Sequence, residues 1–360
     1  MPLTVIVGGQ YGSEGKGKLS AYLACSDPAG VASVRSGGSN AGHTAHRGGV
    51  AYQLRQLPCG AVSAASRLYL AAGMVIDLPV LLREIGELGV ECSRLMIDRN
   101  SVVMSQEDSA REITATLRER VGSTLSGTGA ALARKVMRDP TVRRAADVPA
   151  LNAVARIGDV SEALNLALDR GEHVVIEGTQ GFGLSLHHTD HYPYATSRDT
   201  TAAAFLSDAG LSPGRVTDVV VVLRTFPIRV AGNSGPMHQE ITWADVQQSS
   251  GYPTPLAEYT TVTKKLRRVG CFDWRLAEKA IRANHPTALA LHGADYLDYA
   301  DYGAHSWSSL GDVTRRFVDD LEQRLRVPVE YVFTGPGGEQ LARRPTPAPG
   351  GGADGAGGEG

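Results

Sequence analysis

The sequence has little cysteine and no long apolar run. Its four cysteines (Cys25, Cys59, Cys92 and Cys271) lie far apart and form no CxxC pair, so we expect free thiols in a reducing compartment rather than a disulfide framework or a metal-binding pair. No apolar run reaches the roughly 18 residues of a membrane span, and the first residues lack the basic-then-apolar pattern of a signal peptide. We therefore expect a soluble cytoplasmic protein without a membrane partner.

An excess of charge of one sign is absent as well. The chain has 36 Lys and Arg against 38 Asp and Glu, which argues against direct nucleic-acid or membrane-surface binding. Its length of 360 residues allows a large folded core. The final stretch, "RRPTPAPGGGADGAGGEG" (343–360), holds almost no hydrophobic side chains. We expect a single catalytic domain over residues 1–342 and a disordered Pro/Gly-rich tail over 343–360.

Continuous β-branched runs alternate with helical patterns along the chain. This alternation predicts an α/β protein with a mostly parallel central β-sheet flanked by helices and ligands at the carboxyl ends of the strands. The expected strands cover residues 3–8, 67–73, 94–98, 173–178, 216–226, 287–293 and 327–335. The expected helices cover residues 16–25, 78–88, 106–120, 160–170, 274–283 and 311–325.

Glycines surround a lysine directly after the first expected strand, in "VGGQYGSEGKGKLS" (7–20). A glycine loop between a strand and a helix turns backbone N–H groups toward an anion, to which the helix N-terminus adds its dipole. The spacing departs from the common phosphate loop, because five residues separate Gly9 from Gly15 and Gly17 follows Lys16. The loop by itself is compatible with a phosphate site or with a structural turn.

A second glycine cluster, "RSGGSNAGHT" (35–44), contains Asn40, His43 and Thr44. A histidine whose pKa is near neutrality can donate a proton to a developing oxyanion, whereas an isolated loop histidine is more often an ordinary polar residue. The cluster by itself leaves both interpretations open.

In this order, the two clusters resemble the "GxxWGDEGKGK" and "GGxNAGHT" blocks of the adenylosuccinate synthetase family. Similar blocks continue in family order: "LPCG" (57–60), "GSTLSGTGAALARKVMR" (122–138), "IEGTQGFGLSL" (176–186), "YPYATSRDTTAA" (192–203), "EYTTVTKKLRRVGCFDW" (258–274) and "FTGPG" (333–337). The chain is therefore identified as a member of this family, with the phosphate-loop-like fold and carbon–nitrogen ligase activity that membership implies.

The resemblance implies a two-step reaction. The 6-oxygen of a purine nucleotide attacks the γ-phosphate of a nucleoside triphosphate, and the aspartate amine then displaces the phosphate from the 6-phosphoryl intermediate. Lys16 would contact the γ-phosphate, and His43 would act as a general acid on the 6-oxygen with help from the Gln180 amide. Mg²⁺ would bind at the Gly42 carbonyl and at Ser13, which is also a candidate catalytic residue.

The resemblance also implies binding residues for three ligands. The substrate nucleotide would contact Ser13, Asn40, Ala41, Thr124, Arg138, Gln180, Leu184 and Thr196, with Arg138 supplied by the neighbouring subunit of a homodimer. L-aspartate would contact Val262, Thr263, Lys265 and Arg267. The triphosphate donor would contact Gly12, Ser13, Glu14, Gly15, Lys16, Gly17, Lys18, Gly42, His43, Thr44, Asp295, Gly335 and Pro336.

Several positions depart from the family pattern. Ser13 replaces the Asp that takes the purine N1 proton and binds Mg²⁺, and a hydroxyl is a poorer base and a weaker metal ligand. In "HGAD" (292–295), Gly293 replaces the lysine that packs on the donor base, although Asp295 is retained. Ser126 and Lys265 each replace an arginine, so bidentate pairing is lost at those positions.

Ser13 and the short chain are similar to a phage-associated branch of the family, the 2-amino-2′-deoxyadenylosuccinate synthases. This similarity implies dGMP as the substrate nucleotide and ATP or dATP as the donor, on a route to diaminopurine DNA. Two alternatives remain: an ordinary synthetase that uses IMP and GTP, and an inactive nucleotide-binding homologue. Retention of Lys16, His43, Gln180, Arg138 and Arg267 disfavours the inactive homologue.

Overall fold

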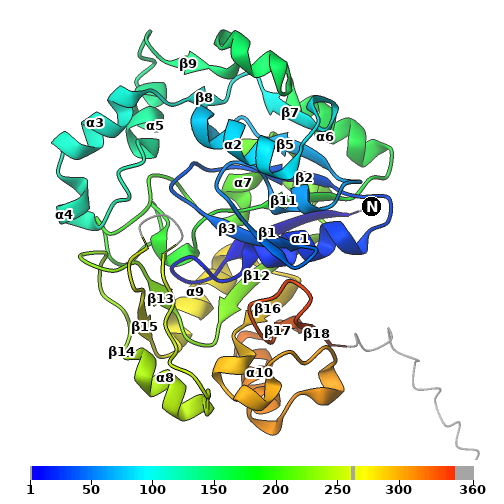
Figure 1. Cartoon of the computed structure of the whole chain (residues 1–360), viewed down its shortest axis with the longest axis vertical. Helices are drawn as coiled ribbons and strands as arrows, with labels where there is room; N and C mark the ends of the chain where they lie inside the picture. Colours follow the sequence, from blue (N-terminus) through cyan, green and yellow to red (C-terminus); the bar gives the residue numbers. More distant parts are fainter. Residues whose placement is uncertain (1, 261–263, 345–360) are drawn as a thin grey trace, which may run out of the picture.

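The computed structural model describes residues 2–260 and 264–344 and has a ten-stranded sheet at its centre (Figure 1). Neighbouring strands pair in parallel throughout, except that β18 is antiparallel to β17. The strands in sheet order are β10 (Arg156–Gly158), β7 (Leu95–Asp98), β5 (Arg67–Leu70), β2 (Ala32–Arg35), β11 (Val174–Glu177), β1 (Leu3–Gly8), β12 (Asp218–Arg224), β16 (Ala288–His292), β17 (Val329–Phe333) and β18 (Leu341–Arg343). The expected fold class is confirmed.

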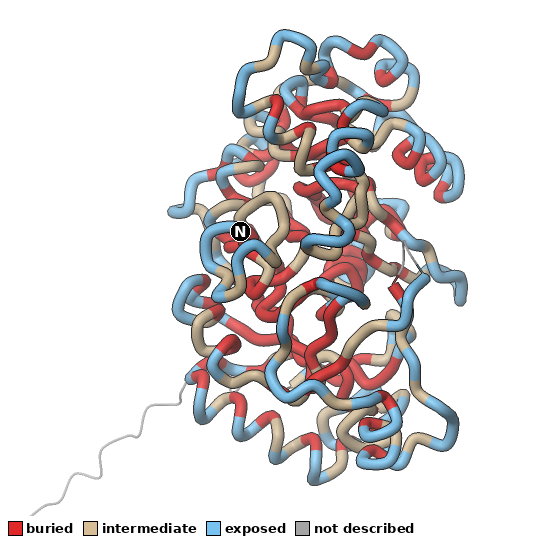
Figure 2. Tube along the Cα trace, turned by 90° about the vertical axis from the view of Figure 1, so that its left-hand side faces the viewer, coloured by how far each residue is buried: buried red, intermediate tan, exposed pale blue. Residues whose placement is uncertain are grey.

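Helices cover both faces of this sheet, because the central strands are apolar on both sides. On β1, Ile6 packs in a cluster with Leu19 of α1, whereas Val5 and Val7 pack in a cluster that contains residues of α6, α7, α9 and α10. The helices are α1 (Lys16–Ser26), α2 (Leu78–Leu88), α3 (Gln106–Thr114), α4 (Leu117–Val121), α5 (Thr128–Val136), α6 (Val160–Asp169), α7 (Ala202–Ala209), α8 (Trp243–Ser250), α9 (Trp274–Asn284) and α10 (Asp312–Leu325). Figure 2 shows that the buried segments run through the middle of the molecule.

Smaller sheets lie beside the main one. In Figure 1, β8 and β9 accompany α3 and α5 at one end of the molecule, whereas β13, β14 and β15 accompany α8 at the other. A two-stranded sheet pairs β3 (His43–Arg47) with β4 (Val50–Leu54). One three-stranded sheet has the order β6 (Val75–Ile76), β8 (Val102–Val103) and β9 (Arg143–Arg144). Another has the order β13 (Ile228–Arg229), β15 (Arg268–Gly270) and β14 (Glu240–Ile241).

Parallel pairing brings the sequence motifs to one edge of the sheet. The glycine loop follows β1, the second glycine cluster begins at the end of β2, and the segment around Gln180 follows β11. These three strands are neighbours in the order β2, β11, β1. Their carboxyl ends therefore gather the motifs where ligands bind in open α/β sheets.

One expected helix is divided in the structure, and three strands of the central sheet, β2, β10 and β18, were not expected. The single helix expected over residues 106–120 is divided into α3 and α4, because Thr116 adopts a left-handed conformation with φ of 51°. Strand β2 was not expected, since its sequence "ASVR" is short and ends in an arginine. It nevertheless occupies a central place, with all four residues buried.

The C-terminal boundary also differs by two residues. Strand β18 extends to Arg343, and Arg344 donates a backbone hydrogen bond to Glu330. The ordered region therefore reaches past the expected start of the tail at residue 343. The rest of the predicted disordered tail, residues 345–360, lies outside the described residues. Within the described part of the chain, we find no helix that is long and apolar enough to cross a bilayer.

Candidate active site

A cavity of about 440 Å³ opens at the carboxyl edge of the sheet. Its wall is built from the loops after β1, β2 and β11, from the segment between α4 and α5, and from residues 192–197. The sequence-predicted residues that line it are Gly12, Ser13, Asn40, Ala41, Gly42, His43, Thr124, Gln180, Leu184, Thr196 and Arg267. The fold thus brings together the residues assigned to the substrate nucleotide, apart from Arg138.

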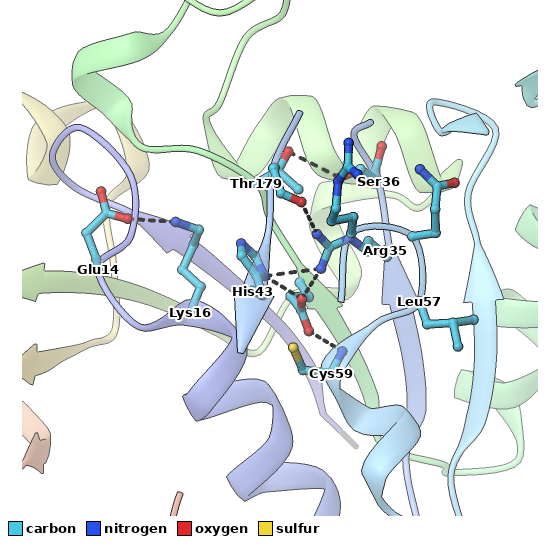
Figure 3. Close-up of polar contacts among 12 residues, drawn as sticks. Glu14, Lys16, Arg35, Ser36, His43, Leu57, Cys59 and Thr179 are labelled. Carbon is cyan, nitrogen blue, oxygen red and sulfur yellow. Dashed lines mark hydrogen bonds and ion pairs between the residues drawn. The ribbon is translucent and has the colours of Figure 1, made fainter. Parts of the chain in front are cut away.

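The glycine loop is held in shape by the side chain of Glu14. Its Oε1 accepts hydrogen bonds from the backbone N–H groups of Gln10 (3.1 Å) and Gly12 (2.8 Å), and its Oε2 accepts one from Lys16 Nζ at 2.6 Å (Figure 3). Both charged side chains are almost fully buried. Glu14 therefore organises the loop from within, and the Lys16 ammonium is paired with this carboxylate in the protein without ligands.

Ser13 lies at the tip of this loop and is exposed on the cavity wall. Its φ of 59° places it in the left-handed region, which is uncommon for a residue other than glycine. Its backbone carbonyl accepts a hydrogen bond from Arg224 at 3.0 Å. This contact ties the loop tip to the end of β12 and leaves the Ser13 hydroxyl at the cavity.

A buried polar network lies beneath the cavity. Glu177 Oε1 lies 2.5 Å from both Arg35 Nη1 and His43 Nδ1, and Glu177 Oε2 accepts a 2.7 Å hydrogen bond from the Cys59 backbone N–H. Figure 3 shows Arg35, His43 and Cys59 converging from separate segments. The network fixes the position of the His43 ring against the end of β11.

The network determines the charge of the imidazole. Burial and the neighbouring Arg35 lower the pKa of His43 to about 4, although Glu177 opposes the shift. Burial alone would raise the pKa of Glu177, but His43 and Arg35 hold it at about 2. Since the carboxylate is ionised and lies 2.5 Å from Nδ1, the neutral ring carries its proton on Nδ1. The His43 imidazole is therefore neutral at physiological pH.

His43, Cys59 and Glu177 each place one potential metal ligand within 4.8 Å of the others. The Arg35 guanidinium already contacts both Glu177 and His43. Burial also raises the pKa of the Cys59 thiol well above its ordinary value, which keeps the thiol protonated. This cluster suits an internal ion pair rather than a metal.

Two residues of the cavity wall, Gln180 and Thr196, each have an unpaired polar atom within the described part of the chain. Gln180 Oε1 and Thr196 Oγ1 are buried, and neither has a hydrogen-bond partner among residues 2–260 and 264–344. Buried polar groups are normally paired, so these atoms are suited to a polar ligand. Glu112 shapes the same wall by accepting the backbone N–H groups of Gly127 and Gly129, both at 3.0 Å.

Of the four residues assigned to L-aspartate, the structure places one at the cavity. Arg267 lines the cavity and donates a hydrogen bond to Glu258 at 3.3 Å, and Glu258 is also paired with Arg224. Lys265 is exposed, and the cavity wall does not include it. Val262 and Thr263 lie outside the described residues.

Arg138 is not part of this cavity. It follows α5, is exposed, and has a φ of 55°. The adjacent Val136 and Met137 are 77% and 79% exposed. An exposed cation beside two exposed apolar side chains has the composition of an interface.

The predicted triphosphate residues spread from the glycine loop toward β16 and β17. Lys18 Nζ donates to the Gly335 carbonyl at 2.5 Å and lies 3.2 Å from His292 Nε2, while burial lowers the pKa of Lys18 to about 8. Gly17 is packed so closely that a Cβ would lie 2.7 Å from that of His43. Gly15 begins α1 with a φ of 105°. Thr44 lies on β3, and Pro336 follows Gly335.

Sequence reasoning missed several residues that organise the site. They are Arg35 and Glu177 beneath His43, Arg224 and Glu258 beside Arg267, and Tyr252, which bonds Asp295. A charged residue at the end of an apolar strand, as in "ASVR" and "VVIE", is the one signal that could have revealed Arg35 and Glu177.

Comparison with known proteins gives the same family at the levels of sequence and structure. The adenylosuccinate synthetase family model matches residues 5–148 and 149–302. The adenylosuccinate synthetase of Methanocaldococcus jannaschii is 40% identical over 337 residues, which cover 92% of this chain and 94% of that protein. That of Thermococcus onnurineus is 38% identical over 347 residues, covering 96% and 99% of the two chains.

Two solved structures resemble the whole chain. Cyanophage S-2L succinoaminodeoxyadenylate synthetase (PurZ), bound to dGMP and to dATP as an energy donor, is 35% identical, with a TM-score of 0.78 over 96% of each chain. Fully ligated adenylosuccinate synthetase from Plasmodium falciparum is 21% identical, with a TM-score of 0.84 over 96% of this chain and 100% of that one. At that identity, the second likeness concerns the fold alone.

Proposed function

Because the chain belongs to the adenylosuccinate synthetase family of carbon–nitrogen ligases, we propose that it joins L-aspartate to the 6-position of dGMP. The donor is ATP or dATP, and the product is 2-amino-2′-deoxyadenylosuccinate, a precursor for diaminopurine DNA. The observation that carries this proposal is Ser13, a neutral residue on the cavity wall where an ordinary family member has a carboxylate. The likeness to a structure that holds dGMP and dATP supports it.

The choice of base follows from the size and hydrogen bonding of Ser13. Guanine has an amino group at C2 where hypoxanthine has only a hydrogen atom, so it needs more room beside N1. A serine side chain is smaller than aspartate, and its hydroxyl accepts one hydrogen bond while donating another. The exposed Ser13 hydroxyl at the cavity therefore suits a guanine edge.

In the first step, the guanine 6-oxygen forms a bond to the γ-phosphorus as the bond to the leaving diphosphate oxygen breaks. Ser13 cannot hold the N1 proton at neutral pH, so that proton passes to water. Lys16, the Gln180 amide and His43 surround the charge that develops on the reacting oxygens. The neutral His43 ring must gain a proton at Nε2 to donate, and the bound phosphates supply the negative charge that favours this gain.

Mg²⁺ is the cofactor that the family implies. The Ser13 hydroxyl and the Gly42 carbonyl both line the cavity and are hard oxygen donors. Mg²⁺ typically takes few protein ligands together with phosphate oxygens and water, so these two residues fit it. When bound, it would neutralise phosphate charge.

In the second step, the aspartate amine attacks C6 and displaces the phosphate. Arg267 and Lys265 hold the two aspartate carboxylates, and Val262 and Thr263 are the other two residues assigned to this ligand. For Arg267 to bind a carboxylate at full strength, its bond to Glu258 must lengthen or be shared. Aspartate binding therefore competes with an internal ion pair.

We further propose a homodimer in which Arg138 of one subunit reaches the nucleotide phosphate of the other, together with Asn40, Thr124 and Thr196. The exposed Val136 and Met137 beside Arg138 support an interface at this place. Residues 1–342 would form one catalytic domain, and the enzyme would act in the cytoplasm, that of the host if a phage encodes it.

The alternative substrate pair is IMP and GTP. Two observations favour it: the curated relatives are ordinary archaeal synthetases, and Asp295 is retained as a carboxylate. The proposal therefore needs an experiment that compares both nucleotides on one enzyme preparation.

The test measures phosphate release with dGMP, GMP or IMP, each combined with ATP, dATP or GTP. We expect kcat/KM for dGMP to exceed that for IMP by roughly ten- to a hundredfold, which is the effect of one lost hydrogen bond to a buried donor. Ser13→Asp should narrow or reverse this ratio, whereas the control Ser13→Ala removes the hydroxyl without adding charge. If the unmodified enzyme prefers IMP, the ordinary synthetase activity is the correct one.

A further inference from the structure

Asp295 is a buried carboxylate with a tyrosine bonded to one of its oxygens. It lies just past the carboxyl end of β16 and is only 2% exposed. The hydroxyl of Tyr252, which follows α8, donates a hydrogen bond to Asp295 Oδ2 at 3.0 Å. One oxygen of the carboxylate is therefore already engaged by the protein.

The Tyr252 ring is fixed by other aromatic rings. Its centroid lies 4.6 Å from that of Tyr299, 5.9 Å from that of Tyr296 and 6.2 Å from that of Tyr302. Tyr296 is held in turn by a 3.0 Å hydrogen bond from its hydroxyl to Glu258. Because packing restrains the ring, the hydroxyl stays on Asp295 instead of rotating into solvent.

Asp295 and Tyr252 lie near residues that were assigned to the triphosphate donor, among them Lys18. Lys18, on the first turn of α1, contacts His292 at the end of β16 and the Gly335 carbonyl after β17. Lys18 also interacts electrostatically with Asp295. If the phosphates of the donor lie along the glycine loop, as the residues assigned to the triphosphate imply, its base lies toward these two strand ends.

Adenine and guanine make different demands on such a carboxylate. Guanine presents two adjacent donors, N1–H and the N2 amine, which call for both carboxylate oxygens at once. Adenine presents only the N6 amine on its Watson–Crick edge, which one oxygen satisfies. We propose that Tyr252 is a specificity-determining residue that occupies Asp295 Oδ2 and so restricts the donor base to adenine. This inference rests on the proposed function.

The experiment compares the unmodified full-length enzyme with Tyr252→Phe, with dGMP and L-aspartate at fixed saturating concentrations. Phosphate release gives kcat/KM for ATP, dATP and GTP. Removing the hydroxyl frees Oδ2, so we expect the GTP to ATP ratio of kcat/KM to rise by roughly tenfold or more. Tyr302→Phe is the matched control, because it removes a hydroxyl from an exposed ring of the same cluster, and its ratio should stay unchanged.

A folding defect does not distort this readout. Both kcat/KM values are measured on one enzyme preparation, and unfolded molecules lower the two values by the same factor, so the GTP to ATP ratio reports only the folded enzyme. If ATP is preferred and Tyr252→Phe leaves the ratio unchanged, the role of Tyr252 is wrong while the proposed donor stands. If the unmodified enzyme prefers GTP, the proposed donor is wrong, and the blocking role of Tyr252 falls with it.

Discussion

Beneath the cavity, Arg35, His43 and Glu177 come from three strands, and Glu177 Oε1 lies 2.5 Å from a nitrogen of each of the other two side chains. At the end of α5, Arg138 lies exposed beside the equally exposed Val136 and Met137. The first region has its partners within the chain, whereas the second presents its groups outward. Substitutions in the network should therefore change both the free energy of unfolding and the rate of the reaction. Substitutions at Arg138 should change only nucleotide binding and dimer formation.

The largest effect should come from breaking the network at its centre. Glu177→Gln removes the carboxylate that Arg35 and His43 share and leaves a buried guanidinium without its counter-charge. We expect the free energy of unfolding to fall by about 3–5 kcal/mol, as for other buried pairs that lose one partner. Urea unfolding followed by circular dichroism measures this change.

Glu119→Gln is the matched control on α4, where the carboxylate is exposed. We expect that variant to stay within about 0.5 kcal/mol of the unmodified protein. An equal effect in the two variants would remove the distinction between the two regions.

A smaller effect, on rate more than on fold, should follow from His43→Ala. The variant loses a preorganised group beside the reacting oxygens, which typically costs about 10²–10³ in kcat. His46→Ala is the control, because His46 lies on the same strand as His43 and outside the cavity wall. Steady-state phosphate release measures both, and near-normal turnover of His43→Ala would contradict its role.

The same variant has a second readout in the pH dependence of stability. The pKa of His43 is lowered from 6.5 to about 4 in the folded protein by burial and by Arg35, so between these values the unfolded chain binds the proton more tightly. Stability should therefore fall as the pH drops from about 6.5 toward 4. Denaturant titrations at several pH values should show a weaker dependence for His43→Ala, and an identical dependence would contradict the lowered pKa.

The smallest effect on stability should come from Arg138→Leu, which tests the outward-facing region. We expect the KM for the substrate nucleotide to rise by roughly ten- to a hundredfold, which corresponds to about 1.5–3 kcal/mol for a charge-assisted hydrogen bond. The melting temperature should stay the same.

The exposed Arg118→Leu on α4 serves as the control, and light scattering reports the oligomer. A monomer that is active at all concentrations would contradict the shared site.

Local patterns were enough to predict most of the sheet but not the strand beside its centre. Strands β1 and β12 could be predicted from their β-branched runs, because both faces of these strands are buried and therefore apolar. Strand β2 is also fully buried, yet Ser33 and Arg35 obscure it, since the partner of Arg35 is Glu177, 142 residues away. Periodicity reports the burial of apolar side chains and carries no information about a distant counter-charge.

The same limit applies to the site. Roles were predicted for the glycine loop and for the segment around His43 because each is a contiguous motif that resembles a family block, although neither segment indicates its role by itself. The lowered pKa of His43 could not be foreseen from its own segment, because it depends on burial and on Arg35 and Glu177, which come from β2 and β11. The inward orientation of Glu14 likewise depends on the tight fold of the glycine loop around its carboxylate.

The pairing of β1 has a consequence for biosynthesis. Val5 is opposite Ile176 on one side and Val219 on the other, so the strand that leads into the glycine loop has no sheet partner until roughly half of the chain has been made. At about 5–20 residues per second, the N-terminal segment waits roughly 10–30 s on the ribosome before β11 emerges. The glycine loop is thus among the first segments to be synthesised, but the strand that leads into it is paired only after about half of the chain has been made, which lengthens the time in which this segment is open to misassociation.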